Sequence, residues 1–536
     1  MLKVNDSIKG ITSYSPAAVN GRLPRVLLVA PFDLNDNGIG LNMGTHRIAH
    51  FLADKGHARV DVVDSVIGFD RTLGRFGQSK RYDIVGVSTL TAIHFKMAVA
   101  KIDMIRRYLG NVLLITGGHG MKMDHDKLFS FKVDIAVMGL GEFPMAEICD
   151  RFAKAGSLLE RFGDVSGISI NNKGRAHKTT PRILTQKDYE TVNDSLDFTK
   201  LPIRPKGRTV EFEMSFSTHC PNVCVFCSAS NFDKRENRRV IYYPEDKILE
   251  KLNRFVDHHM KTNSPERFRV MFSDDNLTVN KARFFRILEG IDEIRKRTKC
   301  EISFECLSRF ECLTDDLLER AAKLGVTAMA VGVESRIPEI LKFLKPGADP
   351  TKLEGLERRM LKYGINPIEF FMVAPPIATT ATILRTAEDM LQAIRNGATV
   401  KPFLRMEAYQ GSPAMTMGFK TKAFEFNSNN TWSLTAPFSL PLYFKNRDRH
   451  VEKILDEIDR TWGKVIKAFC KVREMDPGKF NAVMDDVVGA MLVLSIFHVL
   501  EIKDKRMQDA EETLNILGND PLYFVRKAYD RILPKA

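Results

Sequence analysis

Three cysteines near the middle of this 536-residue chain have the spacing that most clearly implies chemistry. Cys220, Cys224 and Cys227 are spaced C-x3-C-x2-C. Thiolates bind soft metals, so three of them in one short loop indicate a metal centre. Zinc would need a fourth ligand, from His219 or a distant residue. An iron–sulfur cubane has four irons, so three thiolates would leave one iron open to substrate or cofactor.

A predicted β-strand carries the chain to these thiols. Apolar and polar residues alternate over 210–216, the period-two pattern of a half-buried strand. Pro221 and Asn222 then break the chain into a loop. The cysteines therefore lie just beyond the carboxyl end of a strand. Three unrelated core cysteines would be the alternative, and chance rarely produces this spacing.

Segment 209–415 repeats the same strand-then-helix rhythm. Five further strand candidates follow the first, at 269–272, 301–304, 328–333, 368–373 and 400–406. Six such units predict a (β/α)6 partial TIM barrel. Chemistry in such barrels lies at the carboxyl ends of the strands, where the cysteines fall.

Segment 25–164 also alternates strands with helices. The predicted strands are 25–30, 60–63, 83–89, 111–116 and 134–138. This order predicts an α/β domain with a doubly wound, Rossmann-like parallel sheet, whose ligands bind at the carboxyl ends of the strands. The small and polar residues expected at those ends are Ser88, Thr89, Gly117, Gly118, His119, Gly139, Gly141 and Glu142.

The remaining segments are predicted to precede, connect and follow these two domains. Residues 1–24 form a polar N-terminal extension, 165–208 a linker, and 416–536 a C-terminal α-helical domain with helices near 450–473, 478–502 and 507–532. The apolar run 487–500 is shorter than the roughly 20 residues that span a bilayer. It predicts a buried helix, with docking on a membrane or a greasy substrate as the alternative.

The composition of the chain indicates its cellular compartment and the kind of partner it binds. Only three of the eight cysteines cluster and the N-terminus lacks a signal peptide, so a reducing, cytoplasmic location is expected. The formal net charge is +13. That charge favours an anionic small-molecule or peptide substrate, or else describes an ordinary solvated surface. No nucleic-acid motif is present, so a nucleic-acid partner is not expected.

The cysteine motif, with Phe226 before its third cysteine, resembles the radical S-adenosylmethionine (SAM) superfamily. The preceding domain, with V-S-T, G-G-H and G-L-G-E at its strand ends, is similar to the cobalamin-binding domain of one large, methyltransferase-type subclass. The resemblance covers about residues 25–415. It implies a 4Fe–4S cluster, SAM, cobalamin and a flavodoxin- or ferredoxin-type reductant.

Further motifs match the same subclass. F-S-D-D-N resembles its F-x-D-D motif, which implies that Asp274 and Asp275 lie near the methionine part of SAM. Arg309 stands where an arginine often meets the SAM carboxylate. Glu334 and Ser335, in G-V-E-S, would lie near the ribose. The structural alternatives are a helix cap for Asp275, a surface ion pair for Arg309 and a backbone contact for Glu334.

One departure from a related motif bears on the cobalamin. Cobalamin proteins that place a histidine under the cobalt carry Asp-x-His-x-x-Gly after the first strand, and the loop after residue 30 lacks it. The resemblance therefore implies cobalamin without a histidine lower ligand. His46 is at the wrong distance along the chain. His119 is expected to hold the corrin or its tail, with a plain turn as the alternative.

The leading hypothesis is a methyltransferase. One SAM would methylate cobalamin, and a second would yield a 5′-deoxyadenosyl radical that takes hydrogen from an unactivated carbon, which then receives the methyl group. Arg405, Glu407 and Tyr409, at the end of the last predicted strand, are expected to face the substrate, with packing or rim roles as the alternative. The rival functions are a rearrangement or cyclisation with the same cofactors, and a non-catalytic cobalamin-binding sensor or carrier.

Overall fold

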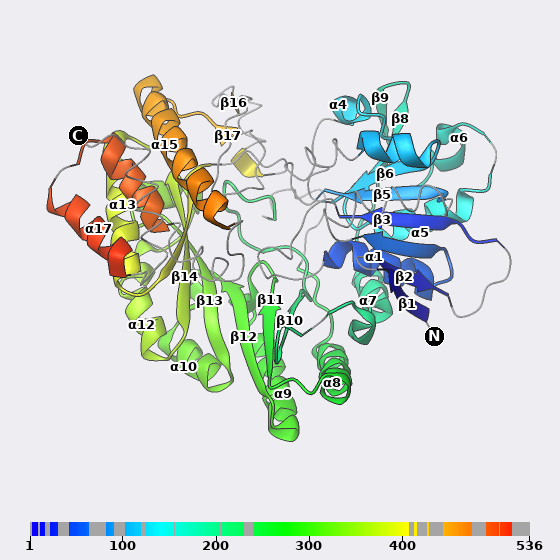
Figure 1. Cartoon of the computed structure of the whole chain (residues 1–536), viewed down its shortest axis with the longest axis horizontal. Coiled ribbons are helices and arrows are strands. Elements are labelled where there is room, and N and C mark those ends of the chain that lie inside the picture. Colours follow the sequence, from blue (N-terminus) through cyan, green and yellow to red (C-terminus); the bar gives the residue numbers. More distant parts are fainter. Residues whose placement is uncertain are drawn as a thin grey trace. The chain divides into compact units, whose positions relative to one another are not determined.

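The structure is a computed structural model of the whole chain (Figure 1). Its polypeptide divides into two compact units, residues 1–217 with 241–269, and residues 218–240 with 270–536. The structure describes residues 3–8, 11–16, 22–30, 42–63, 82–89, 102–118, 125–154, 156–203, 205–229, 240–406, 412–414, 426–427, 443–473, 489–502 and 504–516.

The first unit contains a nine-stranded mixed sheet. In chain order its strands are β1 (Lys3–Ile8), β2 (Ile11–Ser15), β3 (Arg25–Val29), β4 (Arg59–Val63), β5 (Ile84–Ser88), β6 (Leu113–Gly117), β7 (Ile135–Val137), β8 (Ile168–Asn172) and β9 (Arg175–Lys178). They lie side by side in the order β1-β2-β4-β3-β5-β6-β7-β8-β9.

The central five strands of this sheet have doubly wound topology. Strands β4, β3, β5, β6 and β7 pair in parallel, so the second strand lies outside the first and the rest follow in sequence. The direction of winding reverses between β3 and β5. Ligands of such sheets bind at that reversal, beyond the carboxyl ends of the strands. The predicted Rossmann-like sheet is thus confirmed.

Helices cover both faces of this sheet. Leu28 packs in the core with α1 (Met43–Asp54) and α5 (Glu142–Arg151). Its neighbour Leu27 packs on the opposite face with residues 102–109 and α4 (His125–Phe129). Burial on both faces explains why the central strands are continuous apolar runs.

The predicted N-terminal extension and the predicted linker both contain strands. Residues 3–15 form β1 and β2, and β2 pairs antiparallel with β4. Residues 168–178, from the expected linker, form β8 and β9, which extend the sheet from β7. The sequence patterns predicted no strand in either segment. These edge strands include polar sequences such as RAHK in β9, so they lack the apolar runs of central strands.

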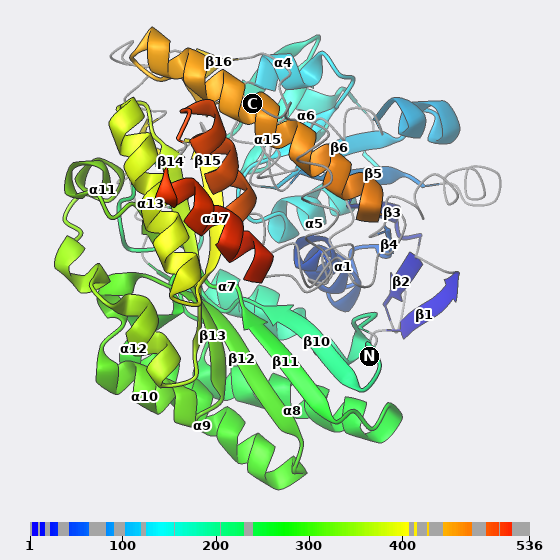
Figure 2. The same ribbon diagram turned by 60° about the vertical axis from the view of Figure 1, so that its left-hand side comes forward.

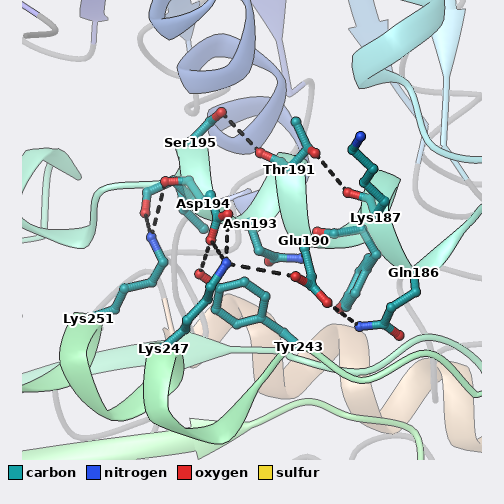
Figure 3. A network of polar contacts seen from close by, with 12 residues as sticks. Gln186, Lys187, Glu190, Thr191, Asn193, Asp194, Ser195, Tyr243, Lys247 and Lys251 are labelled. Atoms are coloured by element: carbon teal, nitrogen blue, oxygen red, sulfur yellow. Dashed lines mark hydrogen bonds and ion pairs between the residues drawn. The ribbon is translucent and has the colours of Figure 1, made fainter.

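Helix α7 (Gln186–Ser195) is joined to α8 (Glu245–Thr262) by a polar network within the same unit (Figure 3). The Asp194 carboxylate accepts hydrogen bonds from Tyr243 Oη, at 2.6 Å, and from Lys247 Nζ, at 2.8 and 3.0 Å. Lys251 Nζ donates to the Leu196 carbonyl at 2.6 Å. Cations at a helix C-terminus stabilise it, so these lysines fasten the end of α7 to α8.

A six-stranded sheet follows in the chain. Its strands lie in sequence order: β10 (Thr209–Met214), β11 (Arg267–Phe272), β12 (Glu301–Ser308), β13 (Val326–Glu334), β14 (Asn366–Ala374) and β15 (Thr399–Arg405). Strands β12 to β15 pair in parallel. The six strands confirm the predicted partial barrel.

Helices line one face of this sheet (Figure 2). They are α9 (Lys281–Thr298), α10 (Asp315–Lys323), α11 (Pro338–Leu344), α12 (Leu356–Lys362) and α13 (Thr380–Arg395). Helix α10 contacts β13, α12 contacts β14, and α13 contacts both β14 and β15. The loops that carry the predicted site residues follow the carboxyl ends of the strands.

The described part of the C-terminal segment is mainly helical. Two short strands, β16 (Phe426–Asn427) and β17 (Tyr443–Phe444), precede α15 (Arg449–Arg473), a helix over 489–499, and α17 (Lys505–Ile516). Residues 489–497 are all buried, as predicted for the apolar run. Over the described ranges, no helix combines the length and apolar character needed to cross a bilayer.

Candidate functional site

The cysteine loop follows β10 and is anchored to α11. Cys220, Cys224 and Cys227 form no disulfide, and each is partly exposed. Between them, the Val225 amide donates to the Leu344 carbonyl at 2.9 Å. Val225 and the partly buried Phe226 also pack in an apolar cluster with residues of α11, β14 and β15. This anchoring holds the three thiols together at the end of the six-stranded sheet.

Polar side chains surround two of the sulfurs. Arg309 Nη1 donates to Cys224 Sγ at 3.1 Å, and Asn222 Nδ2 donates to Cys220 Sγ at 3.3 Å. Burial raises the pKa of Cys224, against the lowering effect of Lys345 and Arg309. Burial also raises the pKa of Cys227 to about 12. Thiols that resist ionisation alone become thiolates when they bind a cationic metal, so this donor set suits a metal centre.

The thiols do not form a single-ion site. Among the described residues, no three His, Cys, Asp or Glu side chains gather in a group that could hold one metal ion. A cubane does not need such convergence, because each thiolate binds a different iron. The donor set and its cationic neighbours fit a cubane with one iron lacking a protein ligand.

Arg309 is held by the carboxylate of Glu311. Its Nε and Nη2 donate to the two carboxylate oxygens of Glu311, at 3.2 and 2.5 Å. This paired geometry fixes the guanidinium plane and leaves Nη1 for Cys224. The side chain is only 14% exposed. The structure therefore places Arg309 against the Cys224 thiol. The contact with the SAM carboxylate that the resemblance implied stays a prediction.

Glu334 and Lys345 form a buried ion pair near the end of β13. Their closest N–O distance is 3.2 Å, and the side chains are 7% and 2% exposed. Lys345 Nζ also donates to the Gly332 carbonyl and lies 5.6 Å from the centre of the Phe310 ring. A Cβ at residue 332 would stand 2.6 Å from the Glu334 carboxylate, so a side chain there would displace the charged end of Glu334.

Glu334 and Ser335 turn the chain from β13 into α11. Glu334 has a φ of +63°, which is uncommon for a residue with a side chain. The buried Ser335 hydroxyl accepts a hydrogen bond from the Ile337 amide at 3.2 Å. Both residues thus have structural partners, as the alternative for Glu334 required. A contact of either with the ribose of SAM stays a prediction.

The acidic pair follows β11. Asp274 is 1% exposed, whereas Asp275 is exposed. Desolvation by the surrounding protein and the charge of Asp274 raise the pKa of Asp275 to about 6. Asp275 also acts electrostatically on Cys227, so the pair lies near the cysteine loop.

The carboxyl ends of β5 and β6 form the predicted cofactor edge of the first unit. The Thr89 amide and hydroxyl both donate to the Gly117 carbonyl, at 2.7 and 2.8 Å. Gly118 has a φ of +112°, and a Cβ there would stand 2.5 Å from the Thr89 carbonyl. Ser88 accepts a 3.5 Å hydrogen bond from Asn42, the residue that caps α1. Main-chain groups pack closely together at this edge of the sheet and are accessible there.

The G-L-G-E segment lies after β7. Gly139 has a φ of +80° with open space around it, whereas a Cβ at Gly141 would stand 2.9 Å from the Ile48 side chain. The buried Glu142 accepts a 2.5 Å hydrogen bond from Arg47 through Oε1. Its other oxygen has no hydrogen-bond partner. A buried carboxylate with one unused oxygen remains available to a ligand.

Of the two histidines considered as cobalamin contacts, the structure describes His46. His46 is fully buried inside α1, and its Nδ1 lies 2.7 Å from Tyr14 Oη. That position fits the expectation that it is no cobalt ligand. His119 lies outside the described residues, so its role stays a prediction.

Arg405 does not face an open site. Its guanidinium, 4% exposed, pairs with Glu452 at 2.7 Å and Asp456 at 2.6 Å, both on α15. The prediction that Arg405 contacts substrate is therefore corrected to an ion pair that holds α15 against the end of β15. Glu407 and Tyr409 lie outside the described residues.

Sequence reasoning missed two charged residues of this site. The motifs quoted above include neither Lys345 nor Glu311. Lys345 follows a helix whose buried residues are Ile340, Leu341 and Leu344, so its burial has a weak sequence signal. Glu311 had no signal, since its importance comes from its contact with Arg309.

Comparison with known proteins places this geometry in a family. Residues 214–390 match the model of the radical SAM superfamily. An uncharacterised methyltransferase of Pyrococcus horikoshii is 27% identical over 310 residues, 57% of this chain and 63% of that protein. The bacteriochlorophyllide d C-12(1)-methyltransferase of Chlorobaculum tepidum is 28% identical over 130 residues, 24% of this chain and 26% of that protein. The chain thus spans less than two thirds of each curated relative.

Two solved structures share the fold. The cobalamin-dependent SAM radical enzyme OxsB superposes with a TM-score of 0.66 at 14% identity, over 95% of this chain and 80% of its own. The radical SAM methyltransferase TsrM from Kitasatospora setae superposes with a TM-score of 0.59 at 16% identity, over 76% of this chain and 79% of its own.

Residues 214–390 are therefore a radical SAM domain, and the resemblance read from the cysteine motif is confirmed. The chain as a whole has the fold of the cobalamin-dependent radical SAM enzymes.

Proposed function

We propose that this chain is a cobalamin-dependent radical SAM methyltransferase that transfers a methyl group from SAM to a carbon atom of its substrate. The carrying observation is the three-thiol loop after β10, with Arg309 hydrogen-bonded to Cys224, inside a radical SAM domain. In such enzymes the reduced cluster cleaves SAM to a carbon radical and cobalamin carries the methyl group.

The chain's own residues would hold these groups. Cys220, Cys224 and Cys227 bind three irons of a 4Fe–4S cluster, and Arg309 offsets part of the negative charge that the thiolates bring. The exposed carboxylate of Asp275 receives the ammonium end of SAM, because a carboxylate attracts a cation. TsrM has been solved with cobalamin and a [4Fe-4S] cluster bound, which supports the assignment by analogy.

Cobalamin is assigned to the carboxyl edge of the first unit's sheet. The winding reverses between β3 and β5, and that crevice is the usual ligand position. Gly117 and Gly118 let a large ring approach the backbone closely, and the unused oxygen of Glu142 can accept a hydrogen bond. The histidine-free lower face remains part of this proposal.

The substrate class is less constrained. The net charge of +13 favours an anionic substrate, but Arg405, the cation expected to meet it, is neutralised by α15. We retain a small-molecule or peptide substrate, and a flavodoxin- or ferredoxin-type protein as the electron donor.

The first test concerns the cluster. Cys220→Ala, Cys224→Ala and Cys227→Ala should each abolish reductive SAM cleavage while cobalamin still binds. Cys306→Ala, in a buried cysteine of β12 outside the triplet, is the matched control and should keep cleavage. Iron and sulfide content, 5′-deoxyadenosine formation and cobalamin absorbance are the readouts. A triplet variant that still forms 5′-deoxyadenosine would overturn the cluster assignment.

The second test separates the reaction classes. The enzyme is incubated with SAM labelled at its methyl carbon and a candidate substrate, and the product is examined by mass spectrometry. Label in the product supports methyl transfer. Product without label favours rearrangement or cyclisation, and a wild-type protein that binds cobalamin but never cleaves SAM favours a sensor or carrier.

A further inference from the structure

Two buried carboxyl groups share one nitrogen atom of Arg336. Arg336 Nη2 donates to Glu357 Oε1 at 2.6 Å and to Glu369 Oε2 at 2.8 Å. Glu357 belongs to α12 and Glu369 to β14, and their side chains are 2% and 0% exposed. Among the residues that the structure describes, no hydrogen bond or ion pair joins either carboxyl to another partner. One positive charge therefore faces two groups that could each be negative.

The surroundings of this pair add more negative charge than positive charge. Asp389 of α13 is 7% exposed and acts electrostatically on Arg336. Its own ion-pair partner is the exposed Arg385, at 3.2 Å, and Glu388 acts on it as a second negative group. Three buried polar atoms of the network have no hydrogen-bond partner, namely Arg336 Nε, Glu369 Oε1 and Asp389 Oδ2. The network thus lacks the donors that two ionised carboxylates would need.

Electrostatics requires this pair to keep a proton. An uncompensated buried charge is expensive, so the two carboxyls cannot both ionise cheaply beside one guanidinium. Glu369 is the member that keeps the proton, because it is fully buried and one of its oxygens has no partner. Burial raises the pKa of Glu369 to about 7, while Arg336 opposes this effect and Glu357 adds to it. When the proton leaves, the pair carries a net negative charge in a buried site.

Arg336 connects this network to the loop with the three cysteines. It directly precedes Ile337, the N-cap residue of α11. Ile337 packs in the same apolar cluster as Val225 of the cysteine loop. At the other end of α11, the Leu344 carbonyl accepts a hydrogen bond from the Val225 amide at 2.9 Å. Both ends of α11 therefore contact the cysteine loop, and Arg336 fastens the first of these ends to α12 and β14.

We propose that Arg336 is a positioning residue for the cysteine loop, and that its hold on α11 depends on one proton kept by the pair of Glu357 and Glu369. Loss of this proton favours an open state in which water reaches the two carboxylates. The start of α11 is then released, and the cysteine loop loses its contacts with that helix. The anchor itself does not depend on the proposed function, whereas its consequence for a bound cluster does.

The direction of the pH effect follows from the pKa of Glu369 in two states. The open state has the ordinary pKa of 4.5, and the closed state has the raised pKa of about 7. Between these values only the closed state holds the proton, so opening becomes about ten-fold more frequent with each pH unit. Well above about pH 7 neither state holds the proton, and the effect levels off. The anchor is therefore firm in acid and weakest above neutral pH.

Hydrogen exchange read by mass spectrometry tests this anchor in the full chain with its cluster reconstituted. Protection, corrected for the intrinsic pH dependence of amide exchange, is compared between about pH 6 and pH 8.5. In residues 218–229 and in α11 it should fall about ten-fold from pH 6 to pH 7 and then level off. Glu369→Gln keeps the shape of the side chain and cannot ionise, so it should remove this step. Glu319→Gln, in an exposed ion pair of α10, is the control and should keep it.

Two further measurements concern the residue that acts and the group that the loop holds. Arg336→Met should lower the protection of α11 and of residues 218–229 by at least about ten-fold at pH 6, because a buried carboxylate loses its partner. Release of iron to a chelator should accelerate over the same pH step in the wild-type chain. In Glu369→Gln this acceleration should be absent. If Arg336→Met does not fold, Glu369→Gln alone decides the question.

The possible failures are distinct. A wild-type chain without the step in α11, or a Glu369→Gln variant that keeps the wild-type step, overturns the proton-dependent anchor. Amides of α11 that exchange no faster than the slowest amides of α9 would mean that the domain opens as a whole, which also overturns it. A wild-type chain that takes up no cluster contradicts the proposed function instead, and exchange in that chain still tests the anchor.

Discussion

The ion pair between Lys345 and Glu334 allows a quantitative test of how the radical SAM unit is held together. Replacing Lys345 by Met leaves the Glu334 carboxylate, 7% exposed, without its partner and frees the Gly332 carbonyl. Removing one member of a buried ion pair costs about 3–5 kcal/mol. We expect Lys345→Met to lower the free energy of unfolding by that amount, measured by urea titration of the anaerobically purified chain.

A double-mutant cycle separates the pair from its surroundings. Glu334→Gln combined with Lys345→Met removes both charges, so the double variant should lose about 2–3 kcal/mol less than the sum of the single losses. The control is Lys323→Met on α10, whose ion pair with Glu319 has side chains 72% and 48% exposed. That variant should change stability by less than about 1 kcal/mol. Additive losses in the cycle, or a loss for Lys345→Met no larger than for the control, would refute the reasoning.

Three further predictions concern other parts of the chain. Gly118→Ala, whose Cβ would meet the Thr89 carbonyl, should lower stability by about 2–3 kcal/mol and weaken cobalamin binding. Gly139→Ala, whose Cβ would lie in open space, should lower stability by about 1 kcal/mol. Thermal melting measures both losses. Burial raises the pKa of the Glu369 carboxyl from 4.5 to about 7, so the folded chain keeps a proton that the unfolded chain releases. The free energy of unfolding should therefore fall as the pH rises through this window. Glu369→Gln should remove this pH dependence, measured by urea titrations at several pH values. Arg405→Met should cost about 2–4 kcal/mol by separating α15 from β15, while SAM cleavage, measured as 5′-deoxyadenosine, stays unchanged.

Local patterns accounted for most of the architecture. Continuous apolar runs marked the central strands of the first sheet because those strands are buried on both faces. The same argument failed for β1, β2, β8 and β9. These strands lie outside the parallel core, and an antiparallel edge strand can keep one face in water. Their place in the sheet depends on pairing with distant segments, which no local periodicity reports.

The sequence by itself determined the chemistry of the site, because the three cysteines lie within eight residues of one loop and their spacing is a local property. Only the tertiary structure decided which charges surround them. Arg309 reaches Cys224 across 85 positions of the chain, and Lys345 meets Glu334 only because α11 returns beside β13. Arg405 pairs with a carboxylate of α15 and does not face the predicted substrate, because the fold brings that distant helix beside it. Charged side chains take partners from whichever elements the βα crossovers bring beside them, and that adjacency is a property of the folded chain.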